Sequence, residues 1–153
     1  MQTPEFDVQT AHRYFAADCF NKTWEYLKQA ERTAAENLDM ISTCQASFWH
    51  WKQFEGHTPL NISIAYWQLS RVYAVTSQPR LALSFATLCL KVSQKNQLSP
   101  FHMAYAYEAL ARASAVAEKQ EEAGTWREHA KKIAESELQG DEKQQLLEDL
   151  NTI

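Results

Sequence analysis

Two arginines occupy equivalent places in two similar stretches of this chain. Residues 58–75 read TPLNISIAYWQLSRVYAV and residues 99–116 read SPFHMAYAYEALARASAV, and an offset of 41 residues places Arg71 on Arg112. A guanidinium group presents a planar fork of N–H donors that suits a carboxylate or a phosphate. If the two stretches fold alike, the two side chains project side by side and could together hold an acidic group of a ligand.

A second group of residues nearer the N-terminus combines polar and aromatic side chains. Asp18, Asn21 and Trp24 are spaced to lie loosely on one face of a helix, and Trp49 and His50 follow within the segment ASFWHW. Residues of this mixed kind can line a small-ligand pocket. We expect Trp49 and His50 to belong to the core in the middle of a helical stack, and the pocket remains the alternative.

The histidines raise the question of metal or acid–base chemistry. His12, His50 and His129 fall on three different expected helices, but the sequence has no HExxH spacing for zinc. It also has no GxSxG motif, no glycine-rich phosphate loop and no local Cys–His signature. We therefore expect no catalytic residue, no metal ligand and no cofactor, and a binding module rather than an enzyme.

The elements that must position these residues are helices. The chain has 153 residues, of which 45% are hydrophobic and 22% charged, as in an ordinary globular domain. Three glycines and four prolines are few for a sheet-rich fold with many tight turns. Alanine, leucine, glutamate, lysine and glutamine are abundant, and these residues favour helices. The composition predicts a single all-α domain over residues 1–153.

Charge and cysteine content restrict the partners and the location. The net charge is −4 and no run of Lys or Arg exceeds two residues, so a nucleic-acid surface is not expected. No apolar stretch is long enough to span a membrane, and the first residues do not resemble a secretory signal. Three widely spaced cysteines lie in apolar helical patterns and predict buried thiols in a reducing compartment. The expected location is the cytoplasm.

Helical periodicity and start signals predict seven helices. Thr33 with Glu36 forms a capping box, Thr58 precedes a proline at a helix start, and Ser99 repeats that signal before Pro100. Gly56 is expected to end the second helix in a left-handed conformation. The expected helices cover about 7–29, 34–54, 59–77, 79–97, 100–118, 120–138 and 141–151.

These helices form pairs, and the pairs repeat. The 41-residue offset also aligns Ala82 with Ala123 and Phe85 with Trp126, which lie beyond the two opening stretches. A helix pair of this kind cannot bury its own apolar face, so it stacks on a neighbouring pair. The sequence predicts three antiparallel pairs, over 7–56 (a degenerate pair), 58–97 and 99–138, and a polar capping helix over 141–151.

The repeated pairs resemble tetratricopeptide repeats (TPR). That pattern combines large, small and aromatic residues on the first helix with small residues on the second. The departures are Ser77 and Glu118 where glycine is usual, Ser114 in place of an aromatic residue, a missing closing proline and a spacing of 41 rather than 34 residues. The longer repeat is similar to the kinesin-light-chain type. The matching residues are Tyr66, Leu69, Ser70, Tyr73, Ala82 and Cys89, and then Tyr107, Leu110, Ala111, Ala123 and Ala130.

The resemblance implies that the first helix of each pair lines a concave groove for a protein or peptide segment. Arg71 and Arg112 would then hold an acidic group of that segment. The alternative is that Glu108 with Arg112, and Trp67 with Arg71, are pairs without function on the surface. A small-ligand sensor or an enzyme around Asp18, Trp24 and His50, and a self-association module that forms a homodimer, also stay open. The groove residues expected to face a ligand are Trp67, Arg71, Tyr105, Glu108 and Arg112.

Overall fold

The computed structural model describes residues 5–153, and within them it contains seven α-helices and no strand. The all-α class is therefore confirmed, and each expected helix is present with its ends shifted by only a few residues. The helices are α1 (Val8–Leu27), α2 (Ala34–Gln53), α3 (Pro59–Val75), α4 (Pro79–Lys95), α5 (Pro100–Val116), α6 (Gln120–Glu137) and α7 (Gly140–Leu150).

Of the three capping residues expected from the sequence, Thr33 and Thr58 cap their helices and Ser99 does not. The Thr33 side chain accepts a hydrogen bond from the Glu36 amide, and the Glu36 carboxylate accepts one from the Thr33 amide at 2.7 Å, which completes the capping box. Thr58 forms the same reciprocal pair with Asn61. Ser99 is the exception, because its side chain caps no backbone N–H and pairs instead with the His102 ring.

Three helices end in the same left-handed turn. Ser77, Gln97 and Glu118 have φ values of 57°, 49° and 60°. After each of them the next backbone N–H bonds to a carbonyl five residues back, as in Gln78 to Tyr73 at 2.8 Å, which is the Schellman arrangement. Gly56 does not share this conformation, so the expected left-handed cap at Gly56 is wrong; α2 ends instead with Phe54 in an extended conformation.

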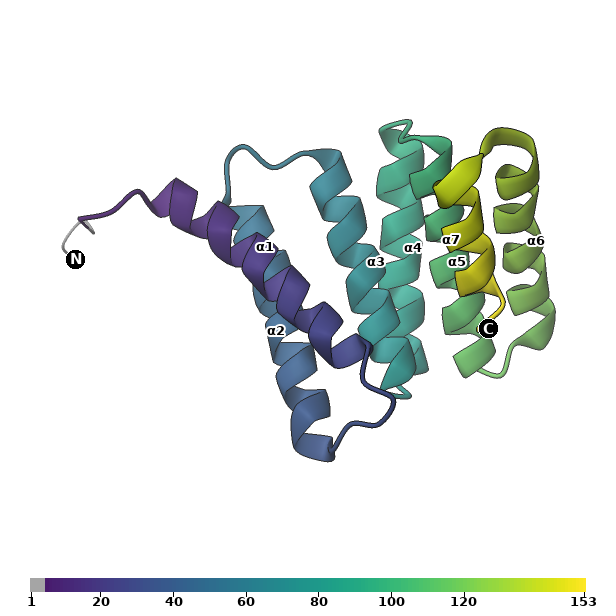
Figure 1. The fold of residues 1–153 in the computed structure, drawn as a ribbon, viewed down its shortest axis with the longest axis horizontal. Coiled ribbons are helices and arrows are strands. Elements are labelled where there is room, and N and C mark those ends of the chain that lie inside the picture. Colours follow the sequence, from purple (N-terminus) through teal and green to yellow (C-terminus); the bar gives the residue numbers. More distant parts are fainter. Residues whose placement is uncertain (1–4) are drawn as a thin grey trace.

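The helices pack in consecutive pairs that stack along the molecule (Figure 1). α1 packs on α2, α3 on α4 and α5 on α6, while α2 contacts α3 and α4 contacts α5 across the pair boundaries. α3 and α5 also lie against each other, and α7 packs on α5 and α6. The molecule is a short helical solenoid in which the first helices of the pairs, together with α7, form one face.

Small residues allow these helices to approach closely. Ala82 and Ala86 of α4 and Ala130 of α6 are fully buried at the crossings within pairs, and the Ser70 hydroxyl bonds to the Ala82 carbonyl at 2.9 Å. Cys44 and Cys89 are buried free thiols, as expected, whereas Cys19 is half-buried. Burial raises the pKa of the Cys89 thiol to about 11, so this thiol is unreactive at neutral pH.

α1 is inclined to the other helices and approaches α3 near its own C-terminal end (Figure 1). There the Gln68 amide of α3 donates to the Phe20 carbonyl at 3.1 Å, and the rings of Trp24 and Trp67 lie 5.6 Å apart. Toward the N-terminus of α1 the two helices diverge and leave one hollow between them, and a second hollow lies between α1 and α2. Among the described residues, no helix has the length and apolar character that crossing a membrane requires.

Candidate binding site

The five groove residues expected from the sequence lie together, around the carboxylate of Glu108. This side chain is fully buried, and its Oε1 atom lies 2.8 Å from Arg112 Nε and 3.4 Å from Arg71 Nη2. The other oxygen accepts a hydrogen bond from the Trp67 indole at 2.9 Å. Because successive first helices contribute the two arginines, α3 and α5 bring them onto the same acceptor.

Asp149 of α7 completes this cluster and was not expected from the sequence. Its Oδ1 atom lies 3.2 Å from Arg71 Nη2, and its Oδ2 accepts a hydrogen bond from the Tyr105 hydroxyl at 2.7 Å. Arg112 donates to the Asp149 carbonyl at 3.1 Å and to Thr152 at 2.7 Å. The sequence indicated only a polar capping helix here. Asp149 lies 37 residues from Arg112 and 78 from Arg71, and no local sequence pattern predicts a contact over such a separation.

The cluster supplies its own acidic groups. Two arginines face two carboxylates, and the arginine side chains are only 14% and 12% exposed. Arg71 contacts these carboxylates through its Nη2 atom alone, and its Nε atom has no hydrogen-bond partner among the described residues. Burial, and then the hydrogen bond to Asp149, raise the pKa of Tyr105 well above its usual range, so its hydroxyl stays protonated. Both pairs named in the alternative are present, since Arg112 binds Glu108 and the Arg71 guanidinium lies 5.4 Å from the centre of the Trp67 ring, but their expected place on the surface is wrong because the cluster is mostly buried.

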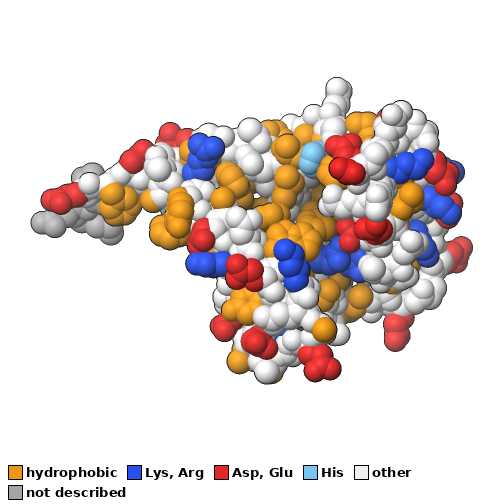
Figure 2. All heavy atoms as spheres, in the orientation of Figure 1, with side chains coloured by type: hydrophobic (Ala, Val, Ile, Leu, Met, Phe, Trp, Pro, Cys, Tyr) orange, Lys and Arg blue, Asp and Glu red, His pale blue; other side chains and the backbone are white. Residues whose placement is uncertain are grey.

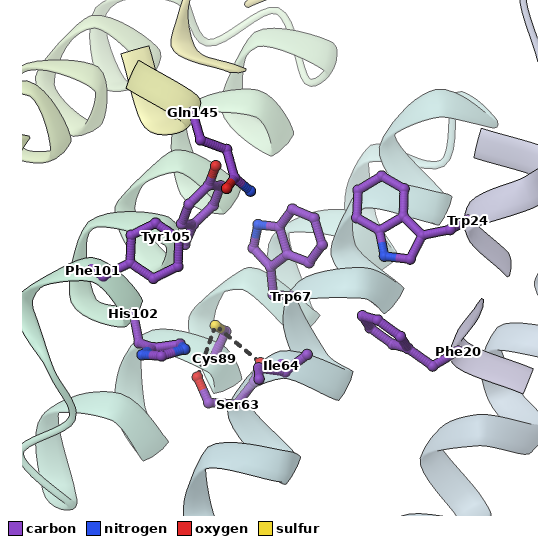
Figure 3. A pocket seen from close by; sticks show the side chains of 10 residues that line it. All are labelled: Phe20, Trp24, Ser63, Ile64, Trp67, Cys89, Phe101, His102, Tyr105 and Gln145. Carbon is purple, nitrogen blue, oxygen red and sulfur yellow. Dashed lines mark hydrogen bonds between the residues drawn. The ribbon is translucent and has the colours of Figure 1, made fainter. Parts of the chain in front are cut away.

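An open pocket lies beside this cluster and shares Trp67 and Tyr105 with it (Figure 3). Its volume is about 240 Å³. Phe20 and Trp24 face it from α1, and Phe101, His102 and Tyr105 face it from α5. Hydrophobic side chains gather over the middle of this face, with a hollow among them (Figure 2). The remaining lining residues are Ser63, Ile64, Trp67, Cys89 and Gln145.

The pocket walls are aromatic rings held by one another and by the buried cluster. The Trp67 ring packs edge-to-face with Tyr105 at 5.6 Å, and Tyr105 packs in the same manner with Phe101 at 5.0 Å. The indole N–H of Trp67 and the hydroxyl of Tyr105 are already bonded to Glu108 and Asp149. These two residues therefore offer the pocket chiefly apolar ring surface in a fixed orientation.

Polar groups lie at the edge of this apolar pocket. His102 Nδ1 lies 2.8 Å from the Ser99 hydroxyl, and burial lowers the pKa of the His102 ring, an effect that the Glu142 carboxylate partly opposes. His102 is therefore neutral at pH 7. The Ser63 hydroxyl is bonded to the Ser93 hydroxyl at 2.7 Å.

The structure does not bring together the five residues of the second candidate site. Trp24 lines the aromatic pocket, whereas Asp18 and Asn21 line a separate hollow between α1 and α2, where Asp18 pairs with Lys22 at 2.8 Å. Trp49 is 53% exposed, so its expected place in the core is wrong. Its ring packs edge-to-face with His12 of α1 at 5.4 Å, and more than half of the side chain still faces solvent.

His50 is half-buried and meets a different partner, His12 of α1. The two Nδ1 atoms lie 2.8 Å apart, while His129 is on α6 beside Tyr107 and Trp126. The three histidines therefore share no site. Within residues 5–153, no group of three or more His, Cys, Asp or Glu side chains is placed to hold a metal ion.

Phe101 and His102 are site residues that the sequence did not indicate, although a signal for Phe101 exists. Phe101, Tyr105, Glu108 and Arg112 follow one another at spacings of three or four residues, so a stripe drawn back along α5 from Arg112 reaches Phe101. Gln145 and Asp149 come from a helix whose docking position cannot be derived from spacing.

Searches of protein-family models, curated proteins and solved structures found no match to this chain.

Proposed function

We propose that this chain is a protein-binding module that holds a segment of a partner protein across the face formed by α1, α3, α5 and α7. The observation that carries the proposal is the open aromatic pocket in the middle of this face. The module has no catalytic activity of its own in this account. A partner side chain enters the pocket, and neighbouring parts of the segment lie along the hollows beside α1, one toward α3 and one toward α2.

The size of the pocket supports a side chain as its occupant. Pockets for whole small-molecule ligands usually measure about 300–1,000 Å³. This pocket measures about 240 Å³, which suits one large side chain. In protein–protein interfaces, a few aromatic or otherwise large residues in desolvated pockets provide most of the binding energy. The pocket therefore has the size and composition of a receptor for such an anchor residue.

The buried cluster supports the same function by fixing the pocket walls. Glu108 and Asp149 hold Trp67 and Tyr105 in place, so binding costs little ordering of these side chains. Arg71 and Arg112 are the groups on this face that suit a carboxylate. In this proposal an acidic residue of the partner reaches Arg71 as a second contact.

The helical repeat supports assignment to the TPR-like class, with long repeats similar to the kinesin-light-chain type. The pairs α3/α4 and α5/α6 are 41 residues apart and show the same turn after the first helix. Ser77 and Glu118, at the positions where that class usually has glycine, adopt positive φ angles. We infer a cytoplasmic module of this class, since the buried thiols Cys44 and Cys89 suit a reducing compartment.

Self-association is a second candidate function, favoured by one observation. The first helix pair exposes aromatic side chains, among them Tyr14 at 62%, Phe15 at 45% and Trp49 at 53%. No preceding pair covers them within the described residues. Light scattering should then give the mass of a homodimer for the wild type and of a monomer for Trp49→Gln; a monomeric wild type would exclude this candidate.

The proposed function is tested by affinity capture with two matched variants. Ile64→Gln places an amide in the half-buried pocket wall, whereas Leu88→Gln makes the same type of change on α4 outside the pocket, at a side chain 39% exposed. We expect at least one protein to be held by the wild type and by Leu88→Gln, and to be lost with Ile64→Gln. Identical sets of proteins from the two folded variants would contradict the proposal.

A further inference from the structure

The pocket presents ring surfaces on three sides. Phe20 and Trp24 come from α1, Trp67 from α3, and Phe101 and Tyr105 from α5 (Figure 3). Two aromatic rings favour an offset or edge-to-face arrangement with their centroids about 4.5–7 Å apart. With rings on three sides, the pocket can place an inserted ring in such an arrangement with several of them. A volume of about 240 Å³ leaves room for one such ring and its substituent.

His102 gives this pocket a polar group with unused hydrogen-bonding capacity. The contact of Nδ1 with Ser99 at 2.8 Å orients the ring, while Nε2 has no hydrogen-bond partner among residues 5–153. Figure 3 shows the imidazole extending from α5 across the pocket toward Ser63. If Nδ1 carries the proton, Nε2 accepts a hydrogen bond; with the other tautomer, Nε2 donates one. A phenol hydroxyl matches both tautomers, and an indole N–H matches the first.

Gln145 gives the pocket a second polar group from the opposite side. Its exposed amide extends from α7 toward the pocket and has no hydrogen-bond partner among the described residues. A purely hydrocarbon occupant would cover polar atoms without replacing the water that hydrates them, and such burial is unfavourable. The pocket therefore suits a ring that carries one polar group better than a ring that carries none.

We infer that the pocket binds an aromatic side chain with a hydrogen-bonding group, a tyrosine or a tryptophan of the partner protein, and that His102 recognises this group. The inference rests on the proposed function and specifies its anchor residue. The rings of α1, α3 and α5 bind the aromatic part, and His102 selects tyrosine or tryptophan over phenylalanine and leucine.

Matched side-chain analogues test the inference by NMR titration of the 15N-labelled full chain. The pairs are 4-methylphenol against toluene, and 3-methylindole against 1,3-dimethylindole, in which a methyl group blocks the N–H. We expect the indole N–H signals of Trp24 and Trp67 to shift, and the hydrogen-bonding member of at least one pair to bind roughly 2- to 10-fold more tightly. If neither pair shows a preference, or if no probe shifts these signals, the inference is overturned.

The variant His102→Phe separates recognition by His102 from general affinity for polar rings. It should keep the binding of toluene within about twofold while the preference within each pair disappears, because only the hydrogen bond is lost. A preference that persists in this variant contradicts the role of His102. If His102→Phe does not fold, His102→Met serves the same purpose, and the wild-type titrations remain decisive by themselves.

Capped amino acids distinguish a partner side chain from a free small molecule. N-acetyl-tyrosinamide and N-acetyl-tryptophanamide carry the flanking peptide groups that a partner segment would have. We expect them to shift the same signals as the bare analogues. If the bare analogues bind and the capped ones do not, the occupant is a free aromatic compound and the assignment to a partner protein is overturned. The capture experiment with Ile64→Gln and Leu88→Gln tests the proposed function independently.

Discussion

At the scale of single residues, Glu108 is the centre of the candidate site. It is fully buried, forms ion pairs with Arg71 and Arg112, and accepts a hydrogen bond from the indole N–H of Trp67. Removing one member of a buried ion pair usually costs about 3–5 kcal/mol, because the remaining charge loses its partner. The carboxylate therefore both stabilises the fold and orients the pocket wall.

We expect Glu108→Ala to lower the free energy of unfolding by about 3–5 kcal/mol, measured by urea denaturation. Glu135→Ala, at an exposed position of α6, is the control and should change it by less than about 0.5 kcal/mol. Equal and small effects of the two substitutions would show that the buried cluster does not contribute to stability.

Two histidines should make the fold sensitive to acid. Burial is the main cause that lowers the pKa of His50 and of His102; the neighbouring His12 lowers that of His50 further, and Glu142 partly opposes the effect at His102. A lowered pKa in the folded state means that protonation favours the unfolded state. The stability that these neutral rings contribute is complete above the ordinary histidine pKa of about 6.5 and is lost as the pH falls through the folded-state values.

We therefore expect the free energy of unfolding of the wild type to fall between about pH 7.5 and pH 5. His50→Gln with His102→Gln removes both titrating groups, so the double variant should show a shallower decrease over the same range. Urea denaturation at the two pH values measures both. A wild type and a double variant with the same pH dependence would contradict the assignment.

At the scale of the elements, the left-handed residues that end α3, α4 and α5 carry strain. For a residue other than glycine, the steric strain of this conformation costs about 1–2 kcal/mol. Glycine avoids the strain but loses more conformational entropy on folding, which costs about 0.5–1 kcal/mol. Glu118→Gly should therefore raise the free energy of unfolding by up to about 1 kcal/mol. Lys91→Gly, in the exposed middle of α4, is the control and should lower it by about 1 kcal/mol. Equal losses in both variants would contradict the account of the turn.

At the scale of the whole molecule, the sequence predicts the helices and their pairing well. Caps such as Thr33 and the 41-residue repeat are local or periodic signals, and they identify the elements and the shared position of Arg71 and Arg112. The contact of Asp149 with Arg71 spans 78 residues and depends on how α7 docks, which no spacing encodes. The exposure of Trp49 depends likewise on whether another pair covers α2, and that is a property of the assembled stack.

The central claim is that partners bind on the face of α1, α3, α5 and α7. A photo-crosslinking amino acid in place of the exposed Gln145 would lie at the edge of the pocket, and the same residue in place of Leu88 would lie on α4 away from it. The account predicts a crosslink to a partner protein from position 145 and none from position 88. Crosslinking from position 88 alone, or from neither position, would contradict it.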